Sequence, residues 1–207
     1  MFTGIIAAVG AIERISPRIQ GLHLIIDSRE LDLSDVAIGD SIAVDGVCLT
    51  AVALGERRFA VDASQETIDC TAGFGTDCGV REVNLEKALR LADRLGGHLM
   101  SGHVDGVGEV TRFEPAGDSR LLSIRTPYAL GKYIARKGSI GVQGVSLTVN
   151  RVQDADSTEF EINLIPHTLS VTTLQHLRVG DRVNLEVDLM ARYVERLFSA
   201  ARSASES

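Results

Sequence analysis

The feature that most constrains this 207-residue chain is an internal duplication. Four blocks recur in the same order, with only small drift in their spacing. The pairs are Thr3–Ile12 with Ser101–Val110, Ser41–Thr50 with Ser139–Thr148, Phe59–Thr67 with Phe160–Thr168, and Val83–Glu86 with Val183–Glu186. Two copies of about 100 residues are too few and too long for a solenoid, which stacks many short units. We therefore expect two domains of one fold, covering residues 1–97 and 98–188, followed by a tail at 189–207.

Short strands dominate the pattern inside each copy. Residues Ser41–Leu54 and Ser139–Val152 alternate apolar and polar side chains and are interrupted by Gly-containing bends. This pattern is typical of β-strands joined by tight turns. Several short strands in so small a domain favour an all-β fold with a closed antiparallel barrel, because closure removes exposed sheet edges. Short helices are predicted at Glu86–Leu95 and Pro127–Ala135.

The last segment differs from everything before it and has no counterpart after the first copy. From Asp188 onward, Leu189, Tyr193, Val194 and Leu197 recur at helical spacing. This spacing predicts an amphipathic helix with one apolar stripe. Such a stripe has to be buried, and association with other subunits is favoured over packing against the same chain.

Charge and cysteine content exclude several classes of protein. A net charge of −7 argues against nucleic acid or an anionic membrane as a partner, since both attract basic surfaces. No apolar run is long enough to span a bilayer, and the N-terminus does not have the pattern of a signal peptide. The three cysteines, Cys48, Cys70 and Cys78, predict neither a disulfide framework nor a metal site. We expect the protein to be cytoplasmic.

Several motifs resemble those of the riboflavin synthase family, over essentially the whole chain. They are Met1–Ile6, Gly46–Thr50, the joint Gly96–Val104, Gly144–Thr148 and Ile165–Leu169. The resemblance implies two tandem six-stranded antiparallel Greek-key β-barrels, and a homotrimer held by the C-terminal helix. Active sites would lie between neighbouring subunits. It leaves open an association with lumazine synthase.

The same resemblance implies a reaction between two identical substrates. Two molecules of 6,7-dimethyl-8-ribityllumazine would undergo dismutation, one donating a four-carbon unit to the other. The products would be riboflavin and 5-amino-6-(ribitylamino)uracil, and the reaction would require no metal or redox cofactor. A duplicated fold suits this chemistry, because two related but unequal pockets can hold the donor and the acceptor in position.

The substrate contacts are expected where the two copies match. Glycine lets backbone approach a flat ring closely, and threonine hydroxyls can bond to its carbonyls and nitrogens. On an extended strand, Cys48 with Thr50, and Ser146 with Thr148, should face away from the alternating Val and Leu. The first copy contributes Gly4, Ile5, Ile6, Ser41, Cys48, Leu49, Thr50, Asp62, Ala63, Ser64, Gln65, Glu66 and Thr67. The second contributes Gly102, His103, Val104, Lys137, Ser146, Leu147, Thr148, Asn163, Leu164, Ile165, Pro166, His167 and Thr168.

The catalytic residues implied by the resemblance are Cys48, His98, His103, Ser146, Lys137 and Asp188. His103 could move protons, Cys48 or Ser146 could donate hydrogen bonds or add to the ring, and Lys137 could stabilise anionic charge. Each has a structural alternative: His98 as a structural histidine, Lys137 as a solvated charge and Asp188 as a helix N-cap. No single essential base is assigned.

Two other functions remain open. One is a non-enzymatic relative resembling the lumazine or flavin antenna proteins, which needs only one good pocket. The other is a flavin-reductase barrel fragment, but the chain has no room for a nicotinamide-binding domain. The stretch Asp69–Val80 departs from the family pattern and pairs poorly with Ser170–Gly180, so the conformation of this loop is not predicted.

Overall fold

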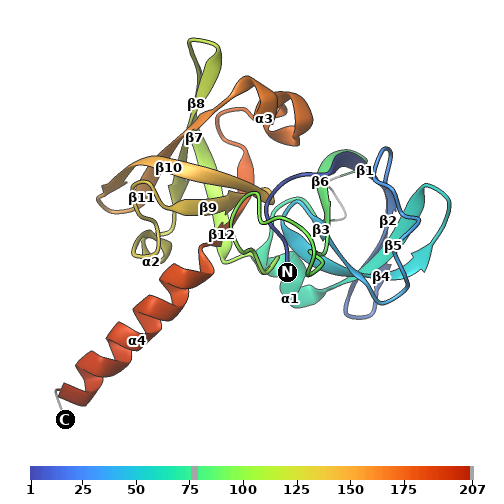
Figure 1. Ribbon diagram of the computed structural model, residues 1–207, viewed down its shortest axis with the longest axis horizontal. Coiled ribbons are helices and arrows are strands. Elements are labelled where there is room, and N and C mark those ends of the chain that lie inside the picture. Colours follow the sequence, from blue (N-terminus) through green and yellow to red (C-terminus); the bar gives the residue numbers. More distant parts are fainter. Residues whose placement is uncertain (76–78, 206–207) are drawn as a thin grey trace.

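The computed structural model describes residues 1–75 and 79–205, with side chains described to residue 201. Cys78, one of the cysteines expected to be unbridged, lies outside the described residues. The chain forms two closed six-stranded antiparallel barrels side by side, and a long helix extends from the second barrel (Figure 1). The predicted fold class is confirmed.

The two barrels share one strand order. The first is β1-β2-β5-β4-β3-β6 and the second, in matching order, is β7-β8-β11-β10-β9-β12. After the first hairpin the chain crosses to β3 and returns through β4 and β5 to pair with β2, which is a Greek-key path.

The bounds of the elements are nearly matched between the copies. In the first copy they are β1 Ala8–Arg18, β2 Gly21–Asp27, β3 Ser41–Val44, β4 Val47–Leu54, β5 Arg58–Ser64, α1 Gln65–Cys70 and β6 Arg81–Lys87. In the second copy they are β7 Gly106–Ala116, β8 Ser119–Thr126, α2 Tyr128–Gly131, β9 Ser139–Val142, β10 Val145–Asp154, β11 Thr158–Leu164, α3 Pro166–Val171, the 3-10 helix η1 Thr173–His176, and β12 Arg182–Val187. Helix α4, Leu189–Ser205, follows.

Each barrel has its own apolar core, because alternate residues of every strand point inward. Phe59 in β5 and Phe160 in β11 are both almost fully buried at matching positions of the two cores. The long first strand of each barrel also carries an irregularity at the same place, after Ile12 and after Val110. The duplication therefore extends to details of the backbone that bend the sheet into a barrel.

The helix predicted at Glu86–Leu95 is wrong. Glu86 and Lys87 continue β6 and pair with β3, where Ala43 lies opposite Glu86, and residues 88–95 are irregular apart from a turn at 91–92. Leu91 and Leu95 are exposed, so their helical spacing has no core to pack against. The helix predicted at Pro127–Ala135 exists only as the single turn α2.

The loop after α1 and the loop after α3 differ in sequence, but their backbones begin in the same way. The hydroxyl of Thr71 donates to the carbonyl oxygen of Thr67, and that of Thr172 donates to the carbonyl oxygen of Thr168, both at 2.7 Å. These bonds end α1 and α3 in the same way. The residues that follow, Ala72 and Thr173, then donate backbone hydrogen bonds to the opposite barrel.

A polar contact with approximate twofold symmetry joins the barrels at these crossings. Ala72 N–H donates to the side-chain oxygen of Asn184 at 2.7 Å, and Thr173 N–H donates to that of Asn84 at 2.8 Å. Each asparagine amide then donates to a turn of the other barrel, Asn84 to the carbonyl oxygen of Gln143 and Asn184 to that of Asp45. Asp45 and Gln143 therefore shape the junction.

Helix α4 projects away from both barrels (Figure 1). Ion pairs fix its first turns to the second barrel: Arg192 to Asp105 at 2.7 Å and Glu195 to Lys132 at 2.7 Å. Among the described residues, no helix combines the length and apolar character needed to cross a membrane.

Candidate functional site

A gap opens in the wall of each barrel where two neighbouring strands separate. In the first barrel, pairing between β4 and β5 begins at Ala51 opposite Val61, so Val47–Thr50 pair with β3 alone. In the second barrel, β10 pairs with β11 from Val149 onward in the same way. Backbone groups in these gaps are available to a ligand, which makes the gaps candidate cradles.

The segment that borders each gap comes from the other copy. Cys48 N–H of the first barrel donates to the carbonyl oxygen of Gly102 at 2.8 Å. Ser146 N–H of the second barrel donates to the carbonyl oxygen of Gly4 at 2.8 Å. Because the two copies exchange these segments, each cradle contains residues from both copies.

The residues that follow these glycines enter the opposite barrels. Val104 packs against the core of the first barrel, whereas Ile6 packs against the core of the second. Neither Gly4 nor Gly102 can be replaced without strain, because both have positive φ. A Cβ atom on either would lie 2.6 Å from the Cβ of Ser146 or Cys48, respectively.

Two buried glutamates hold the exchanged segments in place. Glu86 accepts hydrogen bonds from the N–H and hydroxyl of Thr3 and from the N–H of Gly4. Glu186 accepts the same three bonds from Ser101 and Gly102. Burial raises the pKa of both carboxyls, while the hydrogen bonds act in the opposite direction. Sequence reasoning did not select them, although the repeated Val-Asn-Leu-Glu block carried the signal.

The predicted facing of the cradle strands is confirmed. Thr50 and Thr148 are exposed and Cys48 and Ser146 are partly exposed, whereas the alternating Val and Leu side chains are buried. Four other predicted contacts have side chains in the barrel cores, so only their backbone can meet a ligand. They are Leu49, Ala63, Leu147 and Leu164.

The far wall of each cradle is the turn from a strand into a short helix. In the first copy, the hydroxyl of Ser64 caps α1 by accepting from Thr67 N–H at 3.2 Å. In the second copy, Ile165 takes the cap position without a side-chain bond, and Pro166 opens α3. Other predicted contacts are half-buried or exposed: Ser41 in β3, and Asp62, Gln65, Glu66, Asn163, His167 and Thr168 on these walls. Ile5 is exposed, beside the second cradle.

His98 and Ser146 form a direct contact in the second cradle. His98 is buried, and its Nδ1 lies 2.7 Å from the Ser146 hydroxyl oxygen. Its Nε2 is buried with no hydrogen-bond partner among the described residues. Burial lowers the pKa of the imidazole, and the nearby charge of Asp188 only partly offsets this. In the first cradle Cys48 takes the place of Ser146, and among the described residues no histidine is hydrogen-bonded to it.

Three other predicted catalytic residues have different surroundings. Asp188 accepts the N–H of Met190 at 2.9 Å, so it also performs the N-cap role of its structural alternative. Lys137 is exposed, and its ammonium lies 3.4 Å from the Asn150 side chain, in the strand that carries Ser146. His103 is exposed and directly follows Gly102, which places it beside the first cradle.

Comparison with known proteins follows the same division into two copies. Residues 3–88 and 101–188 each match the family described as the lumazine binding domain. Over 206 residues the chain is 44% identical to a riboflavin synthase from Photobacterium leiognathi, covering 100% of this chain and 93% of the relative. This chain belongs to the riboflavin synthase family. A relative of the same name from Brucella abortus is 43% identical over 202 residues, covering 95% of this chain and 98% of the relative.

Solved structures extend this family resemblance to ligand-bound proteins. LumP complexed with 6,7-dimethyl-8-(1'-D-ribityl) lumazine superposes with a TM-score of 0.78 at 27% identity, covering 90% of this chain and 99% of that one. LumP complexed with riboflavin gives 0.78 at 29% identity, with the same coverage. These structures share the two-barrel architecture.

Proposed function

We propose that this chain converts two molecules of 6,7-dimethyl-8-ribityllumazine into riboflavin and 5-amino-6-(ribitylamino)uracil. Family membership supports this reaction, since the curated relatives named above are riboflavin synthases. The observation that carries the proposal is that both copies keep a cradle of the same architecture but with different reactive groups. Cys48 and His103 adjoin the first cradle, and Ser146 and His98 the second.

That combination suits a reaction between identical molecules with unequal roles. One lumazine has to lose a proton from its C7 methyl group, and the other has to accept a nucleophile at C7. Two matched cradles bind the same substrate, and their different side chains assign the roles. Holding both reactants also removes much of the entropic cost of their encounter.

The His98–Ser146 pair is the best-defined acid–base contact for this chemistry. A neutral imidazole can accept the Ser146 proton as the hydroxyl adds to a ring carbon, or keep the hydroxyl oriented as a donor. Asp188 then stabilises the imidazolium that forms. In the first cradle, the exposed His103 supplies a group that exchanges protons with water. Lys137 stabilises negative charge on the bound ring.

The reaction needs no outside oxidant or reductant. One lumazine gives up four carbons and the other gains them, so the two products together contain every atom of the two substrates. The chemistry asked of the protein is therefore binding, orientation and proton transfer.

A second candidate is a protein that binds lumazine or flavin without converting it. The similarity to LumP, in complexes with both ligands, favours this candidate. Identity to the riboflavin synthases is higher, however, at 44% against 27–29% for LumP. The preserved second cradle, with His98, Lys137 and Ser146, also favours the enzyme, because a single-site binder has no need for it.

Incubation of the purified protein with dimethylribityllumazine alone separates the two candidates. The enzyme should release riboflavin and the aminouracil in equal amounts. The release of riboflavin is measured by its fluorescence. A binding protein should return the lumazine unchanged, and that outcome would overturn the proposed reaction. Titration with a non-reacting analogue should reveal two sites of unequal affinity per chain.

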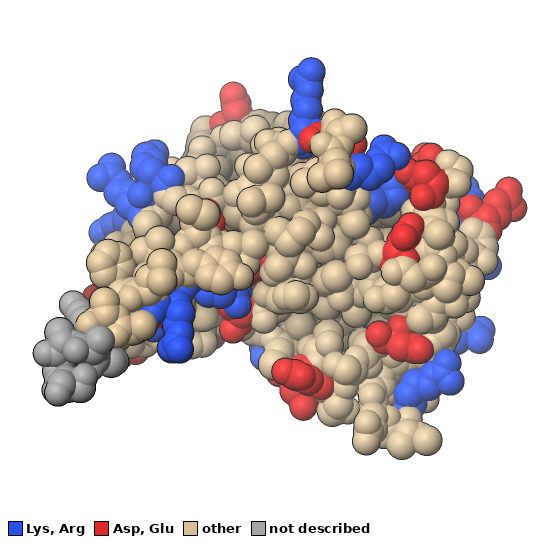
Figure 2. Space-filling model, turned by 60° about the horizontal axis from the view of Figure 1, so that its bottom comes forward, with Lys and Arg blue, Asp and Glu red and all other residues tan. Residues whose placement is uncertain are grey.

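We further propose that the protein works as a homotrimer in the cytoplasm. The apolar stripe of α4 is exposed in the single chain, at Met190, Tyr193, Val194, Leu197 and Phe198. On the face shown in Figure 2, charged side chains gather toward the rim and leave a broad central area of other residues. Both features suit contact with further copies.

Reacting molecules would then meet between subunits. Gly4 adjoins Ser146, Gly102 adjoins Cys48, and Phe2 pairs with Met100 between them, so these segments separate the two cradles of one chain. A first cradle facing a second cradle of a neighbour removes this obstacle. The domain division at residues 97 and 98, and an association with lumazine synthase, stay predictions.

A further inference from the structure

The base of helix α4, meaning Asp188 and the first two turns, lies next to both predicted catalytic histidines. Asp188 lies near His98: burial lowers the pKa of that imidazole, and the charge of Asp188 raises it. Asp105 lies near His103: burial raises the pKa of the Asp105 carboxyl, whereas its hydrogen bonds and the nearby charges of Arg192 and His103 lower it. Each histidine therefore has its own aspartate at the base of the helix.

Asp105 is held at both of its carboxylate oxygens. One oxygen accepts the N–H of Val187 at 2.8 Å, and the other lies 2.7 Å from the guanidinium of Arg192. The N–H of Asp105 donates to the carbonyl oxygen of Leu185 at 2.8 Å, which fixes the backbone where the second barrel begins. The side chain is only 14% exposed. The carboxylate therefore has one orientation, which β12 and α4 set together.

A short segment connects Asp105 to the first cradle. Gly102 borders that cradle, and His103 follows it as an exposed side chain. Val104 packs against the core of the first barrel, so the backbone on both sides of His103 is fixed. The imidazole is the part of this segment that a neighbouring side chain can orient, and the carboxylate of Asp105 lies within electrostatic reach of it.

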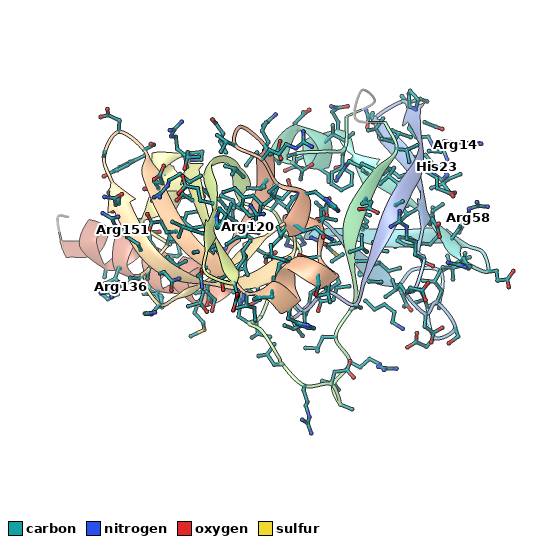
Figure 3. The ribbon with its side chains drawn as sticks, turned by 90° about the horizontal axis from the view of Figure 1, so that it is seen from above. Arg14, His23, Arg58, Arg120, Arg136 and Arg151 are labelled. Carbon is teal, nitrogen blue, oxygen red and sulfur yellow. The ribbon has the colours of Figure 1, made fainter. Side chains whose placement is uncertain are left out.

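Helix α4 extends away from the first barrel, as Figure 1 and Figure 3 show from two directions. An effect of the helix on the first cradle of its own chain therefore has to pass through its base. The ion pair of Arg192 with Asp105 provides that route, two residues along the chain from His103.

Arg192 also balances two acidic groups. Burial raises the pKa of Glu186, and the charge of Asp105 raises it further, so the two carboxylates lie close enough to repel each other. Glu186 is the residue that holds Gly102. The guanidinium of Arg192 offsets this repulsion and thereby stabilises both ends of the segment that carries His103.

The first copy lacks this arrangement. The matching positions are Ile5 for His103, Ala7 for Asp105 and Ala88 for Asp188. The N–H of Ala7 still donates to the carbonyl oxygen of Leu85 at 2.9 Å, so the backbone does not require a carboxylate there. The histidine and the two aspartates occur together in the copy that is followed by α4.

We propose that Asp105 is a positioning residue for His103 and that Arg192 of α4 holds it in place. The inference rests on the proposed function, in which His103 exchanges protons at the first cradle. Each oxygen of a carboxylate can accept a second hydrogen bond, so Asp105 can take one N–H of the imidazole. The other ring nitrogen then faces the cradle, in the arrangement by which an aspartate orients a catalytic histidine. Helix α4 thereby acts on a cradle of its own chain, in addition to the contact with other copies proposed above.

The test is a double-mutant cycle between Asp105 and His103, measured in the turnover of dimethylribityllumazine. Asp105→Asn should lower kcat about tenfold and leave KM within about twofold, because a misplaced acid–base group loses part of its contribution to the rate. In the His103→Ala background, the same substitution should change kcat by less than about twofold, since the group that it orients is gone.

Arg192 provides the second arm of the test. Arg192→Gln should lower kcat as Asp105→Asn does, and Arg192→Lys, which keeps the charge, should recover most of that loss. Lys132→Gln is the matched control, because it removes the other ion pair at the base of α4, with Glu195, and involves neither aspartate. It should leave kcat unchanged. Light scattering should give all of these variants the wild-type mass.

Three outcomes would overturn the inference. They are an equal loss of kcat from Asp105→Asn with and without His103, a loss that follows the oligomer mass, and full activity of both Asp105→Asn and Arg192→Gln. A wild-type protein that forms no riboflavin would instead contradict the proposed function.

Discussion

At the residue scale, the most informative side chain is His98, which is buried against Ser146 with one ring nitrogen lacking a partner among the described residues. Burial lowers its pKa below the ordinary value of 6.5, so the folded state keeps the imidazole neutral where the unfolded chain would protonate it. As the pH falls through 6.5, the unfolded state takes up a proton that the folded state does not. Folding stability should therefore decrease.

The pH dependence of stability provides one prediction. Unfolding followed by circular dichroism between pH 7 and pH 5 should show a decline for the wild type. His98→Gln should flatten that decline, because glutamine does not titrate. A decline of the same size in His98→Gln would assign it to other groups.

The contact between His98 and Ser146 provides a second prediction. Ser146→Ala removes the hydroxyl and leaves a buried nitrogen unpaired, which should cost about 1–3 kcal/mol of stability and most of the turnover. Cys48→Ser is the matched change in the first cradle. It should keep analogue binding and reduce turnover by a different factor, since no histidine in the described part of the chain is bonded to Cys48 as His98 is to Ser146. Single-turnover kinetics compare the two, and equal small effects would show that neither group takes part in the chemistry.

At the element scale, the exchanged segments couple each barrel to the cradle of the other. Glu186 lies in β12 of the second barrel, yet it holds Gly102, whose carbonyl borders the first cradle at Cys48. Glu86 of the first barrel holds Gly4, which borders the second cradle at Ser146. A substitution at either glutamate should therefore weaken ligand binding in the cradle of the opposite barrel.

That coupling is tested by Glu86→Gln and Glu186→Gln. Each variant should lose about 1.5–3 kcal/mol of stability, because a hydrogen bond to a buried charged group is weakened or lost. Glu186→Gln should weaken analogue binding in the first cradle, and Glu86→Gln in the second. Nuclear magnetic resonance of the bound analogue, with Thr50→Ala and Thr148→Ala to assign the sites, distinguishes them. Weakening in the same barrel as the substitution would contradict the exchange.

At the scale of the whole molecule, α4 provides an apolar face that the single chain does not cover. Tyr193, Leu197 and Phe198 are each exposed by 67–72%. Burial of such a side chain stabilises an interface by about 1.5–3 kcal/mol. The ion pairs of Arg192 and Glu195 hold the other side of the helix to the second barrel, so the apolar face keeps a fixed direction.

Truncation after Asp188 removes this helix and its ion pairs to Asp105 and Lys132, but it leaves all twelve barrel strands in place. The mass measured by light scattering should fall to that of a single chain, and turnover should fall sharply if the reacting cradles belong to neighbouring subunits. Analogue binding should survive, since each cradle is built within one chain. An unchanged mass would exclude α4 as the oligomer contact.

The amino-acid sequence was enough to predict the duplication, the all-β class, the final helix and the facing of Cys48, Thr50, Ser146 and Thr148. Periodicity is a local property, and repeated blocks can be aligned without knowing the fold. The exchange of segments, the anchoring by Glu86 and the contact of His98 with Ser146 became visible only in the folded chain. These contacts join residues at least 48 positions apart, and no local pattern encodes them. The same reason explains the wrong helix at Glu86–Leu95: pairing with β3 and three buried hydrogen bonds outweighed its local helical spacing.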